Sequence, residues 1–199
     1  MAARTATAKG VDELLKGLLV LARTVDHVLE TRAVAAGAKR HLSSSKIQIL
    51  RLLGHRGAKT STQVARFLGV SKPAVTQIVD SMTKARLVTR RTAKHDRREV
   101  HLQLSAKGHD LFLAVRNAQR HYIRNALRSP KKRDMSRWIT AMNELSSALG
   151  QADQAFLDFC AHCGAHEDGT CVLVGGDAKC VFEQTLAKDK KKAKSSSKR

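Results

Sequence analysis

The 199-residue sequence predicts a mainly α-helical fold with one small β-hairpin. Apolar residues recur three and four positions apart through most of the chain, which is the spacing of one face of an α-helix. Between Leu87 and Leu104 this period gives way to an alternation of apolar and polar residues, which is typical of strands. Glycine, serine and proline stand between the periodic segments, where helices start and stop.

The first periodic segment predicts one long helix over residues 11 to about 35. Asp12 and Glu13 are expected in its first turn, where acidic side chains interact favourably with the helix dipole. A second helix is expected to be capped by residues 43–45 and to end at Gly54 and Gly57. Its apolar residues are Ile47, Ile49, Leu50, Leu52 and Leu53.

Two short helices joined by a tight turn are expected over residues 61–82. Gly69 suits the left-handed conformation that ends the first of them. Ser71 is a favourable N-cap for the second, and Pro73 falls in its first turn, where a missing N–H costs little. The two apolar stripes consist of Val64, Ala65 and Leu68 and of Val75, Ile78, Val79 and Met82.

A β-hairpin with a basic tip is expected after these helices. Residues 87–89 suit the first strand, and Val100, Leu102 and Leu104 alternate with polar residues in the second. Residues 90–98 would form the loop between the strands. The two helices and the hairpin together predict a winged helix-turn-helix, whose second helix enters the major groove of DNA.

The side chains expected to contact DNA lie on the exposed face of the second helix and in the hairpin. Short or flexible hydrogen-bonding side chains suit base edges and phosphates. The candidates are Ser71, Lys72, Pro73, Thr76, Gln77, Ser81, Arg90, Arg91, Lys94, Asp96, Arg97 and Arg98. Arg97 is expected in the minor groove, with Asp96 orienting an arginine and Arg98 or Arg91 on a phosphate.

The charge of the chain supports a polyanionic partner. Lys and Arg number 37 against 17 Asp and Glu, which gives a formal net charge of +20. Residues 43–107 carry 14 Lys and Arg against three acids, Asp80, Asp96 and Glu99. A solvated surface rarely needs so one-sided a charge, so we expect this region to bind double-stranded DNA.

Two further helices are expected after the hairpin. Ser105 would cap the first, which should end at Ser129 because proline disfavours helix at the preceding residue. Its buried side would comprise Leu111, Phe112, Val115, Ala118, Ile123 and Leu127. Asp134 would open the second, with the near-heptad stripe Met135, Trp138, Ile139, Met142, Leu145 and Leu149. Gly150 is a weak point of this helix, although Phe156 and Phe159 favour its continuation to the first cysteine.

All four cysteines of the chain form one cluster, with the spacing C-x2-C-x7-C-x8-C. This spacing predicts a metal site with the ligands Cys160, Cys163, Cys171 and Cys180. Zinc is favoured by the Cys-x2-Cys-Gly corner, an iron–sulfur cluster tolerates the uneven spacing, and a disulfide switch is a third alternative. His162 and His166 could substitute as ligands, but four thiolates already complete a tetrahedral set.

Four motifs resemble the MarR family of bacterial transcription regulators: LGVSKPAVT at residues 68–76, ARLVTRR at 85–91, Asp96-Arg97-Arg98, and LSAKG at 104–108. The resemblance extends more loosely over residues 11–149. It implies a homodimer, in which the N-terminal helix packs against the C-terminal helices of both subunits. The cysteines depart from the family pattern, so sensing of an inducer could rest on them rather than on a small phenolic molecule.

These observations divide the chain into six expected segments: a flexible basic arm (1–10), an N-terminal dimerisation helix with a linker (11–40), the winged helix-turn-helix (41–107), C-terminal dimerisation helices (108–159), a cysteine-rich metal-binding extension (160–187) and a disordered basic tail (188–199). We expect a dimeric, sequence-specific transcription regulator of the cytoplasm and nucleoid, with repression favoured. The alternative is an architectural, nucleoid-associated DNA-binding protein. Neither a catalytic triad order, a Walker loop nor paired carboxylates indicate an enzyme. No signal peptide or membrane-spanning run is expected.

Overall fold

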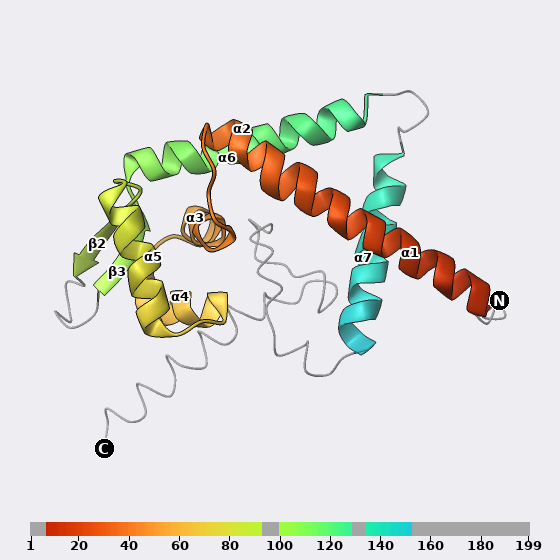
Figure 1. The fold of residues 1–199 in the computed structure, drawn as a ribbon, viewed down its shortest axis with the longest axis horizontal. Coiled ribbons are helices and arrows are strands. Elements are labelled where there is room, and N and C mark those ends of the chain that lie inside the picture. The colour runs from red at the N-terminus through yellow and green to blue at the C-terminus, as the bar shows by residue number, and fades with distance from the viewer. Residues whose placement is uncertain (1–6, 93–99, 129–133, 153–199) are drawn as a thin grey trace, which may run out of the picture. The chain divides into compact units, whose positions relative to one another are not determined.

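The computed structural model describes residues 7–92, 100–128 and 134–152 (Figure 1). Its contacts separate two compact units, one of Met1–Leu42 with Leu113–Arg128 and the other of Ser43–Phe112 with Ser129–Arg199. The fold is mainly helical with one small antiparallel sheet, as the sequence predicts. The sheet and the helices around it form a winged helix-turn-helix.

The first unit begins with a long helical segment in three parts: α1 (Ala8–Val25), the π-helix η1 (Asp26–Arg32) and α2 (Ala33–Ala38). The predicted start was three residues late, because the Oγ1 atom of Thr7 caps the helix by accepting from the N–H of Gly10 at 3.2 Å. Asp12 and Glu13 therefore lie beyond the first turn, which contains no acid, and their predicted position was wrong. A left-handed Lys39 (φ 52°) ends the segment.

The π-helical turn and α2 pack against the C-terminal part of α6 (Ala106–Ala126). The side chain of Gln119 donates to the carbonyl of Leu29 at 2.9 Å, so a side chain of α6 supports the widened turn. A Cβ atom on Gly37 would lie 2.7 Å from the Cα of Val115, so the two helix backbones approach closely at this glycine. The helix α6 ends at Ala126, three residues before the predicted end.

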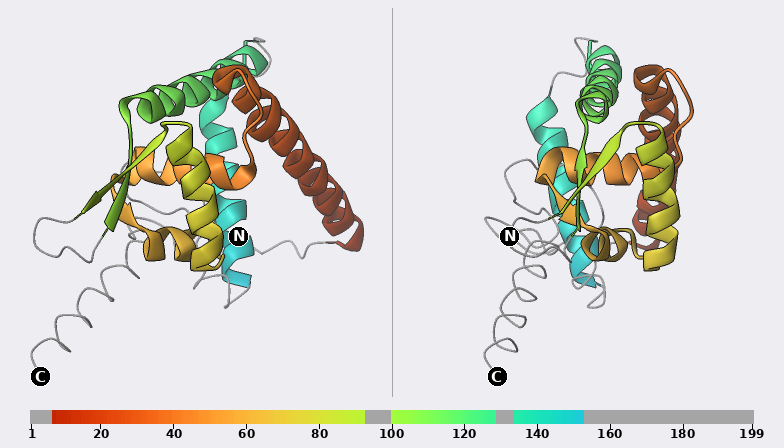
Figure 2. Two further views of the ribbon diagram at one scale, coloured as in Figure 1. Left: turned by 60° about the vertical axis from the view of Figure 1, so that its left-hand side comes forward. Right: turned by 90° about the vertical axis from the view of Figure 1, so that its left-hand side faces the viewer.

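The second unit contains α3 (Ser44–Arg56), β1 (Lys59–Thr60), α4 (Ser61–Leu68), α5 (Lys72–Lys84), β2 (Val88–Thr92) and β3 (Val100–Leu104). The strands form one antiparallel sheet in the order β1-β3-β2, in which β2 contacts α5 (Figure 2). The register aligns Val88 with Leu104 and Arg90 with Leu102. The predicted hairpin is confirmed, and the short strand β1 adds an edge that was not predicted.

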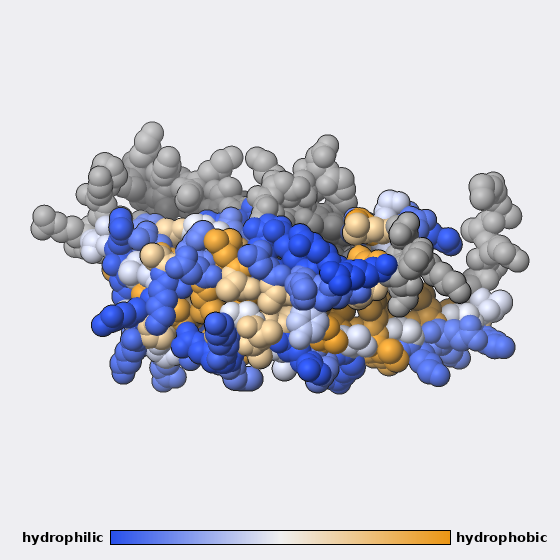
Figure 3. Space-filling model, turned by 90° about the horizontal axis from the view of Figure 1, so that it is seen from above, coloured by the Kyte–Doolittle hydropathy of each residue, from blue (hydrophilic) through white to orange (hydrophobic). Residues whose placement is uncertain are grey.

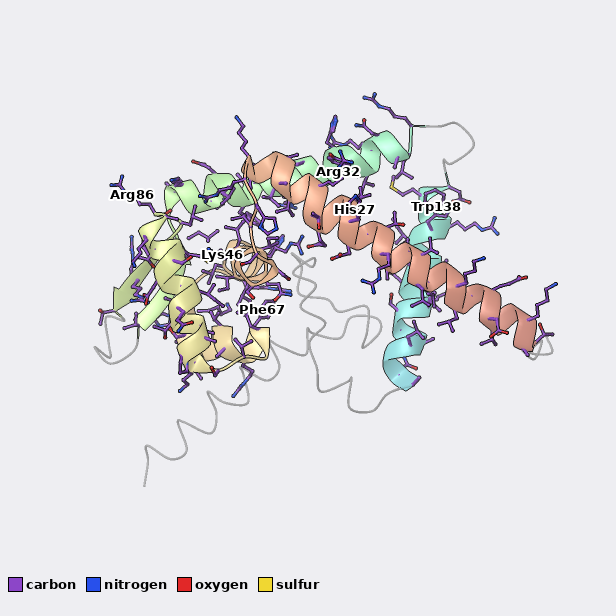
Figure 4. All side chains as sticks on the ribbon, viewed as in Figure 1. His27, Arg32, Lys46, Phe67, Arg86 and Trp138 are labelled. Carbon is purple, nitrogen blue, oxygen red and sulfur yellow. The ribbon has the colours of Figure 1, made fainter. Side chains whose placement is uncertain are left out.

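An apolar core holds the winged helix-turn-helix of this unit together. The largest fully buried side chains in it are Ile49, Leu50, Leu52, Val64, Val75, Val79, Met82, Val88 and Leu102. Phe67 is also buried, at 4% exposure, although the predicted stripe of its helix omitted it (Figure 4). Each such side chain stabilises the fold by roughly 1.5–3 kcal/mol relative to an exposed position.

Gly54 does not end α3 as predicted. It lies inside that helix, where an added Cβ atom would stand 2.7 Å from the ring of Phe112. Gly57 alone ends the helix, with φ at 65°. The glycine at position 54 therefore provides room for an aromatic ring of α6, a long-range requirement that resembles a local stop signal in the sequence.

The last described helix is α7 (Met135–Ala152), and Gly150 does not interrupt it. As predicted, Asp134 caps it, since its Oδ1 atom accepts from the N–H of Arg137 at 3.0 Å. The predicted continuation through Phe156 and Phe159 lies outside the described residues. The near-heptad apolar stripe of α7 is largely exposed, with Trp138 at 42% and Met142 at 50% exposure.

Apolar side chains also reach the surface of α1, in which no residue is buried. Figure 3 shows such side chains, in orange, among hydrophilic ones. The exposed apolar residues of α1 are Val11, Leu14, Leu15, Leu19, Val20, Leu21 and Val25. None of the helices in the described part of the chain has the length and apolarity to cross a membrane.

Candidate nucleic-acid interface

Two well-capped helices form the helix-turn-helix. Thr60 and Gln63 make a capping box at the start of α4: the Oγ1 atom of Thr60 accepts from the N–H of Gln63 at 3.2 Å, and the side chain of Gln63 accepts from the N–H of Thr60 at 2.9 Å. The T-x-x-Q spacing was visible in the sequence and was missed. Gly69 ends the helix in the left-handed conformation (φ 66°), as predicted.

The second helix, α5, presents the predicted polar face to solvent. The Oγ atom of Ser71 accepts from the N–H of Ala74 at 3.4 Å, and Pro73 lies in the first turn, as predicted. Because Val75, Val79 and Met82 are buried, the opposite side of the helix is free of the core. The exposed candidates are Ser71, Lys72, Pro73, Thr76 and Gln77, whereas Ser81 is half-buried.

A left-handed residue turns the chain from α5 into the wing. Arg86 has φ at 58°, and its N–H donates to the carbonyl of Thr83 at 2.9 Å. The N–H of Leu87 donates to the carbonyl of Met82 at 2.9 Å, and both of these apolar side chains are buried. These bonds form a Schellman motif, which satisfies carbonyls at the helix end. The side chain of Arg86 remains exposed (Figure 4).

Two of the sequence motifs meet at this turn. The side-chain hydroxyl (Oγ) of Ser105 donates to the carbonyl of Arg86 at 2.6 Å. The backbone N–H of the same serine donates to the carbonyl of Leu87 at 3.0 Å. The same Oγ atom accepts from the N–H of Gly108 at 3.0 Å, which confirms the predicted cap of α6. The Nζ atom of Lys107 donates to the carbonyl of Ala85 at 3.3 Å. The segments ARLVTRR and LSAKG thus join the end of α5 to the start of α6.

The first strand of the wing is longer than predicted. Arg90, Arg91 and Thr92 belong to β2 rather than to the loop, and all three side chains are exposed. The Nη2 atom of Arg90 lies 2.6 Å from the Oδ1 atom of Asp80, so an ion pair connects the wing to α5. The remaining wing candidates, Lys94, Asp96, Arg97 and Arg98, lie outside the described residues.

The winged helix is strongly basic. Its described residues 43–92 and 100–107 contain eleven Lys and Arg and a single acid, Asp80. One of these bases has a structural position: Lys59 is 8% exposed, and its Nζ atom donates to the carbonyl of Arg56 at 2.5 Å. Among the exposed bases are Lys72 on α5 and Arg90 and Arg91 on β2.

The predicted metal ligands Cys160, Cys163, Cys171 and Cys180 all lie outside the described residues. Within residues 7–92, 100–128 and 134–152, no group of three or more His, Cys, Asp or Glu side chains could hold a metal ion. The metal site therefore stays a prediction from the sequence.

This geometry is that of a winged helix-turn-helix whose second helix, α5, has an exposed polar face. Residues 42–99 match the model of the MarR family. This segment contains the whole of three of the four motifs that resemble the family. The cysteine cluster lies outside the match.

Two curated relatives are similar to part of the chain. The transcriptional repressor MprA of Escherichia coli is 37% identical over 90 residues, which cover 44% of this chain and 49% of that protein. The uncharacterised HTH-type transcriptional regulator YpoP of Bacillus subtilis is 32% identical over 69 residues, covering 35% of this chain and 49% of that protein. The chain spans about half the length of these relatives.

Solved structures show that the fold extends beyond the matched segment. Rv1404 of Mycobacterium tuberculosis has a TM-score of 0.58 at 24% identity and covers 77% of this chain and 99% of its own. FabT of Streptococcus pneumoniae, solved in complex with DNA, has a TM-score of 0.60 at 17% identity, covering 72% and 99%. At these identities the likeness concerns the fold alone, and it confirms the predicted fold class.

Proposed function

We propose that this chain is a sequence-specific regulator of transcription that binds double-stranded DNA as a homodimer. The observation that carries the proposal is the exposed face of α5, where Lys72, Thr76 and Gln77 project from a helix that buries its other side. A helix of this kind fits the major groove, where amide, hydroxyl and ammonium groups discriminate base pairs. The DNA complex of FabT, which has the same fold, supports this use of the fold.

Charge provides the affinity and the polar face provides the specificity. The basic side chains around α5 would release counterions from DNA, a contribution that does not depend on sequence and weakens with salt. Phosphate contacts from Arg91 would set the register of the helix in the groove, and Thr76 and Gln77 would then read base edges. An architectural protein would use the first contribution without the second.

The homodimer rests on the exposed apolar faces of α1 and α7. Large apolar side chains recur in the exposed part of each of these helices, and exposed apolar patches mark interfaces in soluble proteins. A two-fold dimer places two reading helices about 34–36 Å apart, which matches one turn of DNA. Repression is the favoured direction, since the relative MprA is named a transcriptional repressor and a dimer that covers a promoter excludes other proteins from it.

We further propose that the four cysteines bind a metal ion, with zinc ahead of an iron–sulfur cluster. The proposal rests on their spacing in the sequence. Protein purified without oxygen should contain about one zinc per chain, or iron and sulfide with a brown colour. Four free titratable thiols and no metal would refute it. A redox-sensing role further requires DNA binding that responds to oxidant and becomes insensitive in Cys171→Ser.

The reading helix can be tested with a matched pair of threonines. The exposed Thr76 of α5 donates its hydroxyl to the carbonyl four residues earlier at 3.1 Å, and the exposed Thr24 of α1 does so at 2.8 Å. Thr76→Ala combined with Gln77→Ala should weaken binding to a duplex selected by this protein from a random library by about 1–3 kcal/mol. Thr24→Ala removes the same local bond and should leave binding unchanged. Equal binding by all three proteins would refute the role of α5.

A further inference from the structure

We propose that Asp80 is a positioning residue that holds Arg90 of the wing in place against DNA; this inference rests on the proposed function. The two side chains meet at 2.6 Å, from the Oδ1 atom of Asp80 to the Nη2 atom of Arg90. Ten residues separate them in sequence, and they belong to different elements, α5 and β2. The ion pair therefore connects the reading helix directly to the wing.

The position of Asp80 is unfavourable for DNA binding unless the carboxylate has a task there. It is the single acid among residues 43–92 and 100–107, in which eleven bases are present. It follows Thr76 by four residues and Gln77 by three, so it neighbours both on the helix surface. A carboxylate on this surface repels phosphates, and removing it would strengthen attraction to any polyanion.

The ion pair between Asp80 and Arg90 contributes little to the folding stability of the protein. The side chains are 43% and 46% exposed, and ion pairs with this much solvent contact contribute little to folding. An arginine, however, carries five N–H donors in a planar fork, so one carboxylate can orient it and leave other donors for a phosphate. Held in this way, Arg90 meets DNA without first losing the freedom of its long side chain.

The proposal differs from the sequence-based assignment of this part of the wing. The sequence suggested Arg90 as an independent DNA contact and Asp96 as the residue that orients an arginine. Here a carboxylate of the reading helix takes that role toward Arg90. The angle between helix and wing then depends on a side-chain bond as well as on the backbone turn at Arg86.

Asp80→Asn separates positioning from charge. Loss of the orienting carboxylate should weaken DNA binding, whereas loss of a negative charge by itself should strengthen it. Binding would be measured by fluorescence anisotropy over a salt series, with a duplex selected by this protein from a random library and with a scrambled duplex. The proposal expects Asp80→Asn to weaken binding to the selected duplex about fivefold or more, although the protein becomes more positive. The plot of log K against log salt should become shallower by about one unit of slope on both duplexes. Arg90→Ala should make it shallower by the same amount. The double variant should show no further loss.

Asp110→Asn on α6 makes the same charge change in the same unit and serves as the control. Tighter binding of Asp80→Asn to both duplexes, with an unchanged or steeper salt slope, would overturn the proposal. Additive losses in the double variant would overturn it as well. A parent protein that binds both duplexes alike would contradict the proposed regulatory function, and the salt slopes would still decide whether Asp80 positions Arg90.

Discussion

The contact between Gly108 and Leu87 offers a sharp test of how the reading helix is held. Gly108 lies in the first turn of α6, and its position allows the carbonyl oxygen of Leu87 to approach. An added Cβ atom would stand 2.0 Å from that oxygen and 3.0 Å from the carbonyl carbon. Ordinary contacts begin at 3.4 Å, so Gly108→Ala must separate the two segments by about 1.4 Å.

The cost of that displacement can be worked out from the bonds around it. Overpacking of a tight site costs about 1–3 kcal/mol. The shift also strains the bonds from Ser105 to the carbonyls of Arg86 and Leu87, each worth roughly 0.5–1.5 kcal/mol. Alanine regains about 0.5–1 kcal/mol of helix propensity over glycine. We therefore expect a net destabilisation of about 1–5 kcal/mol, with the upper end reached if both bonds are lost.

Gly17→Ala is the matched control, because Gly17 is also helical and its added Cβ atom would meet nothing within 4 Å. Urea unfolding followed by circular dichroism, at one protein concentration, should show Gly108→Ala less stable than the parent and Gly17→Ala equal to it or more stable. If Gly108→Ala matched Gly17→Ala, the close approach of α6 to the turn after α5 would be refuted.

Four further predictions concern individual sites. Arg86→Gly should stabilise the protein by about 0.5–1 kcal/mol in urea unfolding, because glycine adopts the left-handed conformation without strain; a loss of stability would contradict this reading of the turn. Thr60→Ala should cost about 1 kcal/mol through loss of the capping box, and an unchanged midpoint would argue against that cap. Arg97→Ala should weaken binding of the selected duplex by about 1–3 kcal/mol, whereas undiminished binding would exclude the wing tip from the interface. Leu15→Glu should shift the mass from light scattering from dimer toward monomer, with Lys16→Glu as control; a parent that is monomeric at micromolar concentration would refute the dimer.

Local signals made most of the winged helix predictable from the sequence. Gly69, Ser71 and Pro73 are start and stop signals that act within one turn, and the structure shows each in the expected role. The buried positions Val75, Val79 and Met82 follow from helical spacing alone. The exposed polar face of α5 then follows, since a helix that buries one side exposes the other.

The features that the sequence did not reveal depend on contacts between distant segments. Gly54 resembled a helix end because glycine commonly ends helices. The reason for a glycine at this position is the ring of Phe112, which lies almost sixty positions later in the sequence and leaves no room for a Cβ atom. The two-residue strand β1 is too short to show alternation and is defined by its pairing with β3. Arg90 looked like a free loop arginine because its partner Asp80 lies on another element. The π-helical turn at residues 26–32 has no signal that we recognise in the sequence, although Gln119 supports it in the fold.

The central claim, that the chain reads DNA sequence through α5, is tested most directly by a ratio of two affinities. A duplex selected by the protein from a random library should compete with a scrambled duplex of the same length and composition at 0.15 M salt. The account predicts that the selected duplex binds about 10³-fold tighter or more, the range of specific regulators. A ratio near one, with both affinities falling steeply as salt rises, would contradict it and identify a protein that binds DNA through charge alone.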